Sequence, residues 1–230
     1  MTDWLLTIRQ AAPRLPRLLC SLAPTMRLEH VGELDDAALA RERVRGLIWD
    51  VDGTITYAGG CEPAPEAEAA IQRLHRAEGV RHVILSNGTD ARCEVLSVRF
   101  PDVPVLTAFR TPAGVAFRRM QAGRVVWSGA EANGGSMRRI RKPSEDLVRF
   151  AVRELDLHAA EVAMVGDQYL TDIAGANLAG VRSIKVPTLG RSTFPFAVRV
   201  LMRIDEWLFR LTGALLPRAR VPAERANGRP

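Results

Sequence analysis

The sequence predicts an α/β fold built on a doubly wound parallel sheet, with helices on both faces in three α/β/α layers. Two observations lead to this fold class. Short apolar runs typical of buried strands alternate along the chain with amphipathic helical segments, and right-handed crossovers between such strands produce a parallel sheet. The acidic and small polar residues that stand out come directly after these runs, at the sheet edge where such folds bind ligands.

Each expected element rests on its local pattern. The expected strands cover residues 46–51, 80–85, 103–106, 161–165 and 181–186, and the expected helices cover residues 66–77, 90–98, 144–155 and 171–179. The first of these helices has Ala70, Ile71 and Leu74 on one face, and Gly79 follows it as a stop signal. Ser144 stands where the third helix needs an N-cap.

The chain of 230 residues has the length of one main domain with flanking arms. We expect a partly amphipathic N-terminal arm over residues 1–43 and the main domain over residues 44–190, with a basic insertion at 110–141. We expect an amphipathic helix within residues 191–216 and a disordered tail over residues 217–230.

Composition excludes several classes of protein. A hydrophobic content of 47% with 25% charged residues is typical of a globular protein and not of a disordered or fibrous one. The chain lacks the apolar run of about 20 residues that spans a bilayer, and Asp3 and Arg14 interrupt any signal peptide. The three cysteines are scattered and the four histidines lack metal-ligand spacing, so we expect reduced thiols in the cytoplasm and no zinc site.

Positive charge gathers in three segments. The net charge of +6 is concentrated in residues 1–28, 110–141 and 191–230, which suggests an anionic substrate or surface. Of the 32 basic residues, 30 are arginine, and only Lys142 and Lys185 are lysine. A lysine retained in such a chain indicates a place that requires a compact ammonium group.

Four groups of residues carry possible chemistry. Asp50 and Asp52 leave the first strand two residues apart, and Gly53 and Thr54 complete a turn that can bring both carboxylates to one side. One carboxylate can attack phosphorus while the other moves a proton. Asp-Gly turns are common, so this group alone is only moderately specific.

The other three groups follow the same order as the strands. Ser86 and Asn87 supply a hydroxyl and an amide near a helix N-terminus, which suits phosphate. Lys142 supplies a point charge. Asp167 and Asp172 are spaced to hold a hard cation such as Mg²⁺. Each group alone is more often a turn, a cap or a surface charge.

Together, Asp-x-Asp-Gly-Thr, Ser-Asn, Lys-Pro and Gly-Asp-x4-Asp resemble the haloacid dehalogenase (HAD) superfamily of phosphohydrolases over about residues 44–188. The run Gly166-Asp-Gln-Tyr-Leu-Thr-Asp-Ile-Ala-Gly-Ala-Asn177 and Arg141-Lys142-Pro143 look like its type IIIA subfamily, which includes YqeG-like proteins and phosphatidylglycerophosphate phosphatases. Gly53 departs from the asparagine usual in that subfamily, which weakens the subfamily assignment, but glycine is common in the superfamily.

The resemblance implies a role for each matched residue. Asp50 would be the nucleophile that forms an aspartyl-phosphate, and Asp52 the acid for the leaving alcohol and then the base for water. Lys142 would stabilise the phosphoryl group, which Ser86, with Asn87, Gly53 and Thr54 nearby, would hold. Mg²⁺ would be held by the Asp50 carboxylate, the Asp52 carbonyl and Asp167, with Asp172 beside the metal.

The segments outside these motifs suggest the substrate. Only 33 residues separate Asp52 from Ser86, which leaves no room for a large cap and favours a bulky or surface-embedded substrate. The insertion 110–141 is either a flap at the site or a tolerated surface addition. Residues 194–216 form an amphipathic cationic helix that either lies on a membrane or packs on the core.

The expected function is therefore Mg²⁺-dependent hydrolysis of a phosphomonoester on a membrane lipid such as phosphatidylglycerophosphate, by a minimally capped cytoplasmic enzyme that could sit peripherally on the inner face of the membrane. A soluble phosphatase for a nucleotide, sugar phosphate or nucleic-acid end is the alternative. A catalytically inactive binding protein is the third, and the four intact catalytic positions argue against it. The sequence carries no strong signal for nucleic-acid binding and none for an oligomeric state.

Overall fold

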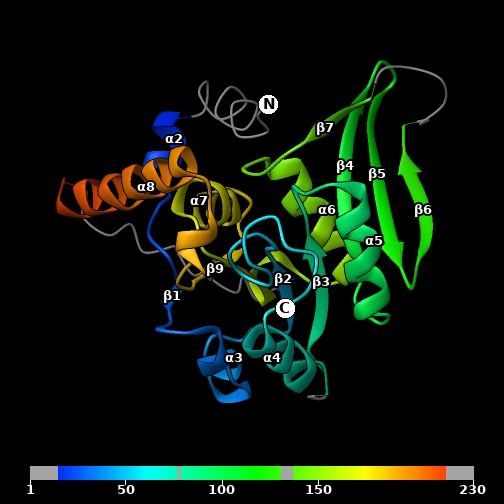
Figure 1. Cartoon of the computed structure of the whole chain (residues 1–230), viewed down its shortest axis with the longest axis horizontal. Helices are drawn as coiled ribbons and strands as arrows, with labels where there is room; N and C mark the ends of the chain where they lie inside the picture. Colours follow the sequence, from blue (N-terminus) through cyan, green and yellow to red (C-terminus); the bar gives the residue numbers. More distant parts are fainter. Residues whose placement is uncertain (1–14, 77–78, 131–136, 216–230) are drawn as a thin grey trace, which may run out of the picture.

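The described part of the chain forms one mixed sheet of nine strands in the order β1-β9-β8-β2-β3-β4-β5-β6, with β7 paired to β4 (Figure 1). The computed structural model describes residues 15–76, 79–130 and 137–215. The strands are β1 Met26–Arg27, β2 Gly46–Trp49, β3 Arg81–Leu85, β4 Val105–Thr111, β5 Gly114–Gln121, β6 Arg124–Gly129, β7 Arg138–Ile140, β8 Val162–Gly166 and β9 Arg182–Lys185. Strands β1, β9, β8, β2, β3 and β4 run parallel, which confirms the predicted α/β class.

Helices cover both faces of the parallel part. They are α2 Leu15–Leu19, α3 Asp36–Arg41, α4 Pro65–Arg76, α5 Asp90–Arg99, α6 Glu145–Leu155, α7 Ala174–Leu178 and α8 Phe196–Leu215. Short 3-10 turns occupy Val31–Glu33, Ala159–Glu161 and Arg191–Thr193, and a π-helical turn occupies Tyr169–Ile173.

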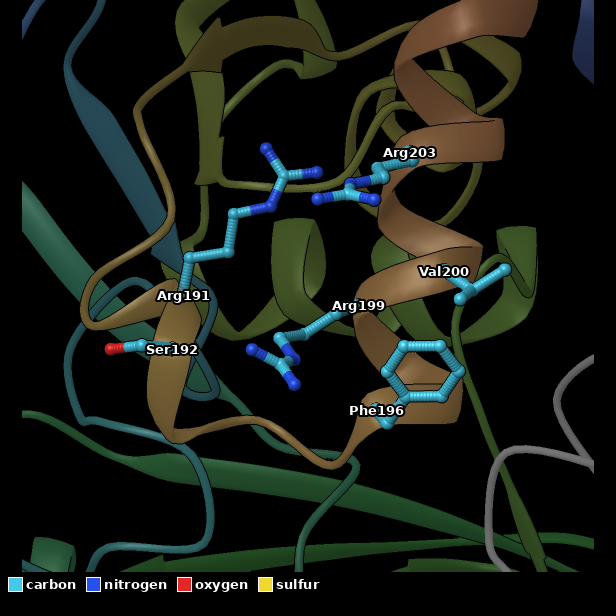
Figure 2. A pocket seen from close by; sticks show the side chains of 6 residues that line it. All are labelled: Arg191, Ser192, Phe196, Arg199, Val200 and Arg203. Carbon is cyan, nitrogen blue, oxygen red and sulfur yellow. The ribbon is translucent and has the colours of Figure 1, made fainter.

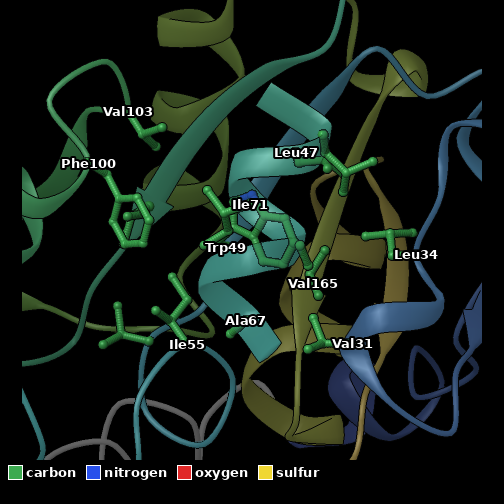
Figure 3. Packing of buried hydrophobic residues seen from close by; sticks show 14 of the residues in the cluster. Val31, Leu34, Leu47, Trp49, Ile55, Ala67, Ile71, Phe100, Val103 and Val165 are labelled. Atoms are coloured by element: carbon green, nitrogen blue, oxygen red, sulfur yellow. The ribbon is translucent and has the colours of Figure 1, made fainter. Parts of the chain in front are cut away.

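The side chains of β2 point alternately to the two faces of the sheet and so belong to two separate core layers. Leu47 and Trp49 join the cluster that includes the buried faces of α3, α4 and α5, whereas Ile48 joins the cluster beneath α6 and α7. Figure 3 shows Trp49 packed beside Ile71 of α4. Since successive strand residues point to opposite faces, a strand buried on both sides is apolar throughout, as the run before Asp50 is.

The basic insertion forms an antiparallel extension of the sheet. In its described part, β4 continues past its parallel section and pairs with β5 and β7, and β5 pairs with β6. The β5–β6 turn places Ala122 (φ 48°) and Gly123 (φ 73°) in the left-handed region, as tight hairpin turns require. The described residues 110–130 of the insertion thus form strands of a hairpin, and β7, described from residue 138, leads into Lys142.

Part of the expected N-terminal arm belongs to the main domain. Strand β1 pairs with β9 at the edge of the sheet, and α3 packs through Leu39 into the core. Residues 1–14 of the expected arm, like the expected tail at 217–230, lie outside the described residues.

Helix α8 packs on the domain and also exposes an apolar face. Leu208 and Phe209 pack with Leu18 and Leu22 of the N-terminal segment and with the π-helical turn, and α8 lies beside α2 in Figure 1. On the other side, a line of apolar side chains at spacings of four, four, three and four is exposed: Phe196, Val200, Ile204, Trp207 and Leu211. No described helix is both long enough and apolar enough to cross a bilayer.

Candidate active site

Three neighbouring parallel strands end at the same place and bring the predicted residues together. Strand β2 leads into Asp50 and Asp52, β3 leads into Ser86 and Asn87, and β8 ends one residue before Asp167. Their carboxyl ends lie side by side because β2 pairs with both β3 and β8. The sheet edge predicted from the sequence is therefore the edge where these side chains gather.

A buried ion cluster forms the centre of the site. Lys142, which follows β7, points its Nζ at two carboxylates: it donates to Asp50 Oδ1, and to Asp172 Oδ1 at 2.7 Å. All three residues are at most 5% exposed. Asn87 fixes the lysine from the other side, because its Oδ1 accepts a hydrogen bond from the Lys142 backbone N–H at 3.0 Å.

Two glycines allow the carboxylates to approach each other. Gly53 has a φ of +82°, and a Cβ there would lie 2.6 Å from Asp167 Oδ2. A Cβ on Gly166 would collide with Asp172. Thr54 donates from Oγ1 to Asp50 Oδ2 at 3.2 Å and is fully buried. The Asp-Gly-Thr turn is thus required by the geometry of the site.

The acidic groups fit a divalent cation. Asp50, Asp167 and Asp172 are buried, and one carboxylate oxygen from each lies within 4.8 Å of the others. Both carboxylate oxygens of Asp167 are buried and lack a hydrogen bond of full geometry among the described residues, with the Thr188 side chain as a weak donor beside them. A buried carboxylate with so weak a partner is costly, and oxygen ligands of this kind suit Mg²⁺. Both oxygens of Asp172 accept hydrogen bonds, from Lys142 and from the Gln168 N–H, so Asp167 is the better placed ligand.

Burial and charge crowding shift the protonation of these groups. Burial, reinforced by the Asp172 charge, raises the pKa of Asp50 to about 7, although Lys142 opposes the shift. Burial and the charges of Asp50 and Asp172 raise the pKa of Asp167 well above its usual range. Burial disfavours the Lys142 ammonium, but the Asp172 and Asp50 carboxylates outweigh it and raise the pKa of Lys142. The crowded, buried carboxylates therefore favour binding of a proton or of a cation at this site.

Asp52 has a partner that the sequence reasoning missed. Its Oδ1 accepts from Arg92 Nη2 of α5 at 2.8 Å, and the same nitrogen lies 3.0 Å from Thr56 Oγ1. Arg92 is only 8% exposed and lies beside Gly88 in the loop after β3. In a chain with 30 arginines, no local pattern marks Arg92 as a partner of Asp52. Its position on the buried face of a predicted helix is the one feature that could have drawn attention to it.

Ser86 and Asn87 lie at the site with different surroundings. Ser86 is buried, and its Oγ accepts from the Gly88 N–H at 3.0 Å, which leaves its hydroxyl proton to donate. Asn87 is committed to Lys142, and its carbonyl oxygen accepts from Arg141 Nη1 at 3.2 Å. Ser86 is therefore the freer of the two to hold a phosphoryl oxygen.

Helix α8 supports the site through Asp205, which the sequence reasoning also missed. The Asp205 carboxylate accepts from the Tyr169 N–H at 2.7 Å and from the Leu170 N–H at 2.8 Å, at the start of the turn that carries Asp172. Burial raises the pKa of Asp205 to about 6. Lys185, the second lysine, lies over the Tyr169 ring at 5.0 Å and donates to the Val186 carbonyl at 2.7 Å. Burial lowers the pKa of Lys185, and the charge of Asp167 opposes that shift.

Comparison with known proteins finds similarity to one family model and to two proteins named as phosphatases. The HAD-hydrolase-like family model matches residues 139–193, which include Lys142, Asp167 and Asp172. Over 194 residues the chain is 27% identical to phosphatidylglycerophosphate phosphatase 1, chloroplastic, of Chlamydomonas reinhardtii, covering 82% of this chain and 62% of that relative. Over 165 residues it is 22% identical to the probable phosphatase YqeG of Bacillus subtilis, covering 72% and 77%.

The chain thus spans less than two thirds of the length of the first of these relatives. A solved structure of an uncharacterized protein from Listeria monocytogenes serotype 4b aligns with 70% of this chain and 99% of its own, at 16% identity and a TM-score of 0.42.

Proposed function

We propose that this chain, which matches the HAD-hydrolase-like family model over residues 139–193, hydrolyses a phosphomonoester through an aspartyl-phosphate, with Mg²⁺ at the Asp50–Asp167–Asp172 cluster. The observation that carries the proposal is the contact of Lys142 with Asp50 beside the weakly partnered carboxylate of Asp167. A nucleophilic carboxylate, a compact cation and a cation ligand are then in place together.

In the first step, an Asp50 carboxylate oxygen attacks phosphorus, a P–O bond forms, and the bond from phosphorus to the alcohol oxygen breaks. Asp52 donates a proton to that oxygen as the alcohol leaves. In the second step, the same Asp52 takes a proton from water, the hydroxide oxygen attacks phosphorus, and Asp50 is released. Bound Mg²⁺ would neutralise charge on the phosphoryl oxygens.

The protein groups around the phosphoryl position support these steps. Lys142 keeps its positive charge at the nucleophile, since the pKa of its ammonium is raised by two carboxylates. The Ser86 hydroxyl is free to donate to a phosphoryl oxygen. Arg92 holds the Asp52 carboxylate in position through a charge-assisted hydrogen bond.

We propose a lipid phosphomonoester, with phosphatidylglycerophosphate first, as the substrate class. The exposed apolar line on α8 lies beside arginines on the same helix, a combination typical of helices at an anionic membrane surface. A relative of this chain carries the name phosphatidylglycerophosphate phosphatase. The described residues between Asp52 and Ser86 form a loop, α4 and β3 rather than a cap domain, which favours a bulky substrate.

The test is a phosphatase assay with Mg²⁺ over phosphatidylglycerophosphate in vesicles, sugar phosphates, nucleotides and p-nitrophenyl phosphate. Wild type is compared with Asp50→Asn and with Asp156→Asn, a matched control because Asp156 is exposed and its left-handed backbone (φ 50°) tolerates asparagine. We expect turnover to vanish in Asp50→Asn and with EDTA, and to persist in Asp156→Asn. Full turnover by Asp50→Asn would refute the nucleophile, and preference for a soluble substrate would favour the alternative function.

A further inference from the structure

Beside the α8 helix, three arginines gather around one cavity that the proposed catalytic steps do not use. The cavity has a volume of about 290 Å³ and is lined by Arg191 and Ser192 of the preceding turn and by Phe196, Arg199, Val200 and Arg203 of α8. Figure 2 shows the side chains of Arg191, Arg199 and Arg203 reaching into the space between the turn and the helix.

The arginines have hydrogen-bonding capacity that the described part of the chain leaves unused. Arg191 Nη1 pairs with Glu206 Oε1 at 2.7 Å, but Arg191 Nη2 and Arg199 Nε are buried and have no acceptor among the described residues. Phe196 lies 5.8 Å from the Arg199 guanidinium and supports it as a cation–π partner. Buried donors without acceptors are rare and costly, and converging like charges add to that cost. An anionic oxygen group in the cavity would accept hydrogen bonds from these donors and offset the repulsion between the arginines.

The location of the cavity favours a phospholipid over a free ion. Phe196 and Val200, which line it, are also the first two residues of the exposed apolar line that continues to Leu211. A ligand with its charged group in the cavity could therefore lay an acyl chain along α8. The volume is near the lower end for small-molecule sites, so it suits a headgroup and leaves the chains outside.

The turn that lines the cavity also contacts the Asp-Gly-Thr turn of the candidate active site. The turn that carries Arg191 follows Leu189, whose N–H donates to the Gly53 carbonyl at 2.8 Å, and Gly190 packs against Tyr57. The chain therefore connects the arginines to the Asp-Gly-Thr turn within a few residues.

We propose that the Arg191–Arg199–Arg203 cavity is a phospholipid site, in which the guanidinium groups bind the phosphodiester of an anionic lipid. The proposal rests on the lipid reading of the proposed function and adds the residues that recognise the lipid. Planar guanidinium groups bind phosphate oxygens through paired hydrogen bonds, which a lysine ammonium cannot reproduce.

The test uses the full chain and vesicles of phosphatidylcholine with phosphatidylglycerol, and measures binding by co-sedimentation at constant ionic strength. Arg199→Lys keeps the charge and removes the planar group. Arg210→Lys makes the same exchange at an exposed position of α8 outside the cavity. We expect Arg199→Lys to bind vesicles about tenfold more weakly than wild type and Arg210→Lys to bind as wild type. Melting curves of both variants check that they fold.

Three results overturn the proposal. A loss below about fivefold in Arg199→Lys, or an equal loss in Arg210→Lys, would mean that diffuse charge attraction suffices. The third result uses inorganic phosphate as the probe. If phosphate protects the wild type against thermal unfolding, and Arg199→Lys loses this protection but still binds vesicles as the wild type does, the cavity binds a free ion.

The proposed function can fail separately. Vesicle binding requires no turnover, so a chain that binds through Arg199 but hydrolyses no phosphomonoester would overturn the proposed function alone. If the protein hydrolyses p-nitrophenyl phosphate with Mg²⁺, but the wild type and Arg199→Lys bind vesicles equally well, the lipid site alone is overturned.

Discussion

Lys142 is one of two lysines in a chain with 30 arginines, and the space around it explains why it is not an arginine. It is 2% exposed, and its ammonium lies between the carboxylates of Asp50 and Asp172. A guanidinium is wider and planar, so it would displace one carboxylate. The general expectation that a retained lysine marks a compact cation site holds for Lys142, whereas Lys185 lies over the Tyr169 ring and interacts with the charge of Asp167.

We therefore expect Lys142→Arg to lower kcat on the order of 100-fold, the size of effect seen when one group that stabilises a transition-state anion is lost. Arg45→Lys, at an exposed surface pair with Glu161, is the control and should keep full activity. Steady-state kinetics with melting curves of both variants make the measurement. Near-normal kcat in folded Lys142→Arg would show that positive charge alone is enough.

The raised pKa of Asp50 gives a dependence of metal binding on pH. Between the ordinary value of 3.8 and about 7, the metal-free folded state holds a proton on Asp50 that the unfolded state has lost, so metal-free stability falls as the pH rises through this range. Mg²⁺ must displace that proton. Below pH 7, the Mg²⁺ concentration for half-maximal activity should fall by at least about tenfold for each unit of rising pH, because the pKa of Asp167 is raised as well.

Mg²⁺ titrations of activity between about pH 5.5 and 8.5 measure this dependence, with thermal unfolding in the presence and absence of Mg²⁺ as a second readout. Mg²⁺ should raise the melting temperature more at pH 8 than at pH 6. A half-saturating Mg²⁺ concentration that does not change with pH would contradict a protonated Asp50 in the metal-free site.

The sequence motifs predict the acidic residues and the lysine of the candidate site, but they do not predict the side chains that hold these residues in place. Asp50, Asp52, Lys142, Asp167 and Asp172 were chosen from spacing and resemblance, and the structure brings them to one edge of the sheet. Arg92 and Asp205 come from helices distant in sequence, and their contacts with Asp52 and with the Tyr169 and Leu170 N–H groups depend on tertiary packing. Local sequence patterns carry no information on such pairs.

Among the elements, the buried parallel strands were the easiest to predict, because continuous apolar runs must lie inside the sheet. The helix expected over 171–179 is instead a π-helical turn over Tyr169–Ile173 followed by the five-residue helix α7. The wider turn brings Asp172 against Gly166 and presents two N–H groups to Asp205. Strand β1 was not predicted, since two residues are too few to show a pattern.

The contribution of the contact between α8 and the π-helical turn to stability and turnover can be measured. Asp205→Ala removes the acceptor of two buried N–H groups, so we expect unfolding free energy to fall by about 2 kcal/mol and turnover to fall because Asp172 loses its support. Arg210→Ala, at an exposed position on the same helix, should change neither. Urea unfolding and p-nitrophenyl phosphate kinetics test both variants. A stable Asp205→Ala with normal kcat would show that the turn keeps its shape without α8.

For the molecule as a whole, α8 has two faces with different roles. Deletion of residues 194–230 removes Met202, Leu208 and Phe209 from the core, so it should lower the melting temperature and also release the protein from vesicles. Trp207→Ser separates the effects, because Trp207 is 58% exposed. It should weaken vesicle binding by several fold, through lost hydrocarbon contact, and leave the melting temperature unchanged.

Val126→Ser is the control for Trp207→Ser, since Val126 is 54% exposed but lies on β6, away from α8. It should bind vesicles as wild type. Equal vesicle binding by wild type and Trp207→Ser, or no binding by wild type, would leave α8 with its packing role alone and favour a soluble substrate.

The pairing of β1 with β9 has a consequence for the order in which the chain can fold during synthesis. Met26 pairs with Ile184, and Asn177 donates to the carbonyls of Ser21 and Ala23, so the N-terminal segment finds its partners only after almost all of the sheet has been made. The inner strands β2 and β3 can pair much earlier, because they are close in sequence. Contacts between distant segments form late, and domains emerge from the ribosome N-terminus first. The segment around Leu18 and Leu22 is therefore made before its partners and is among the last parts of the sheet domain to dock.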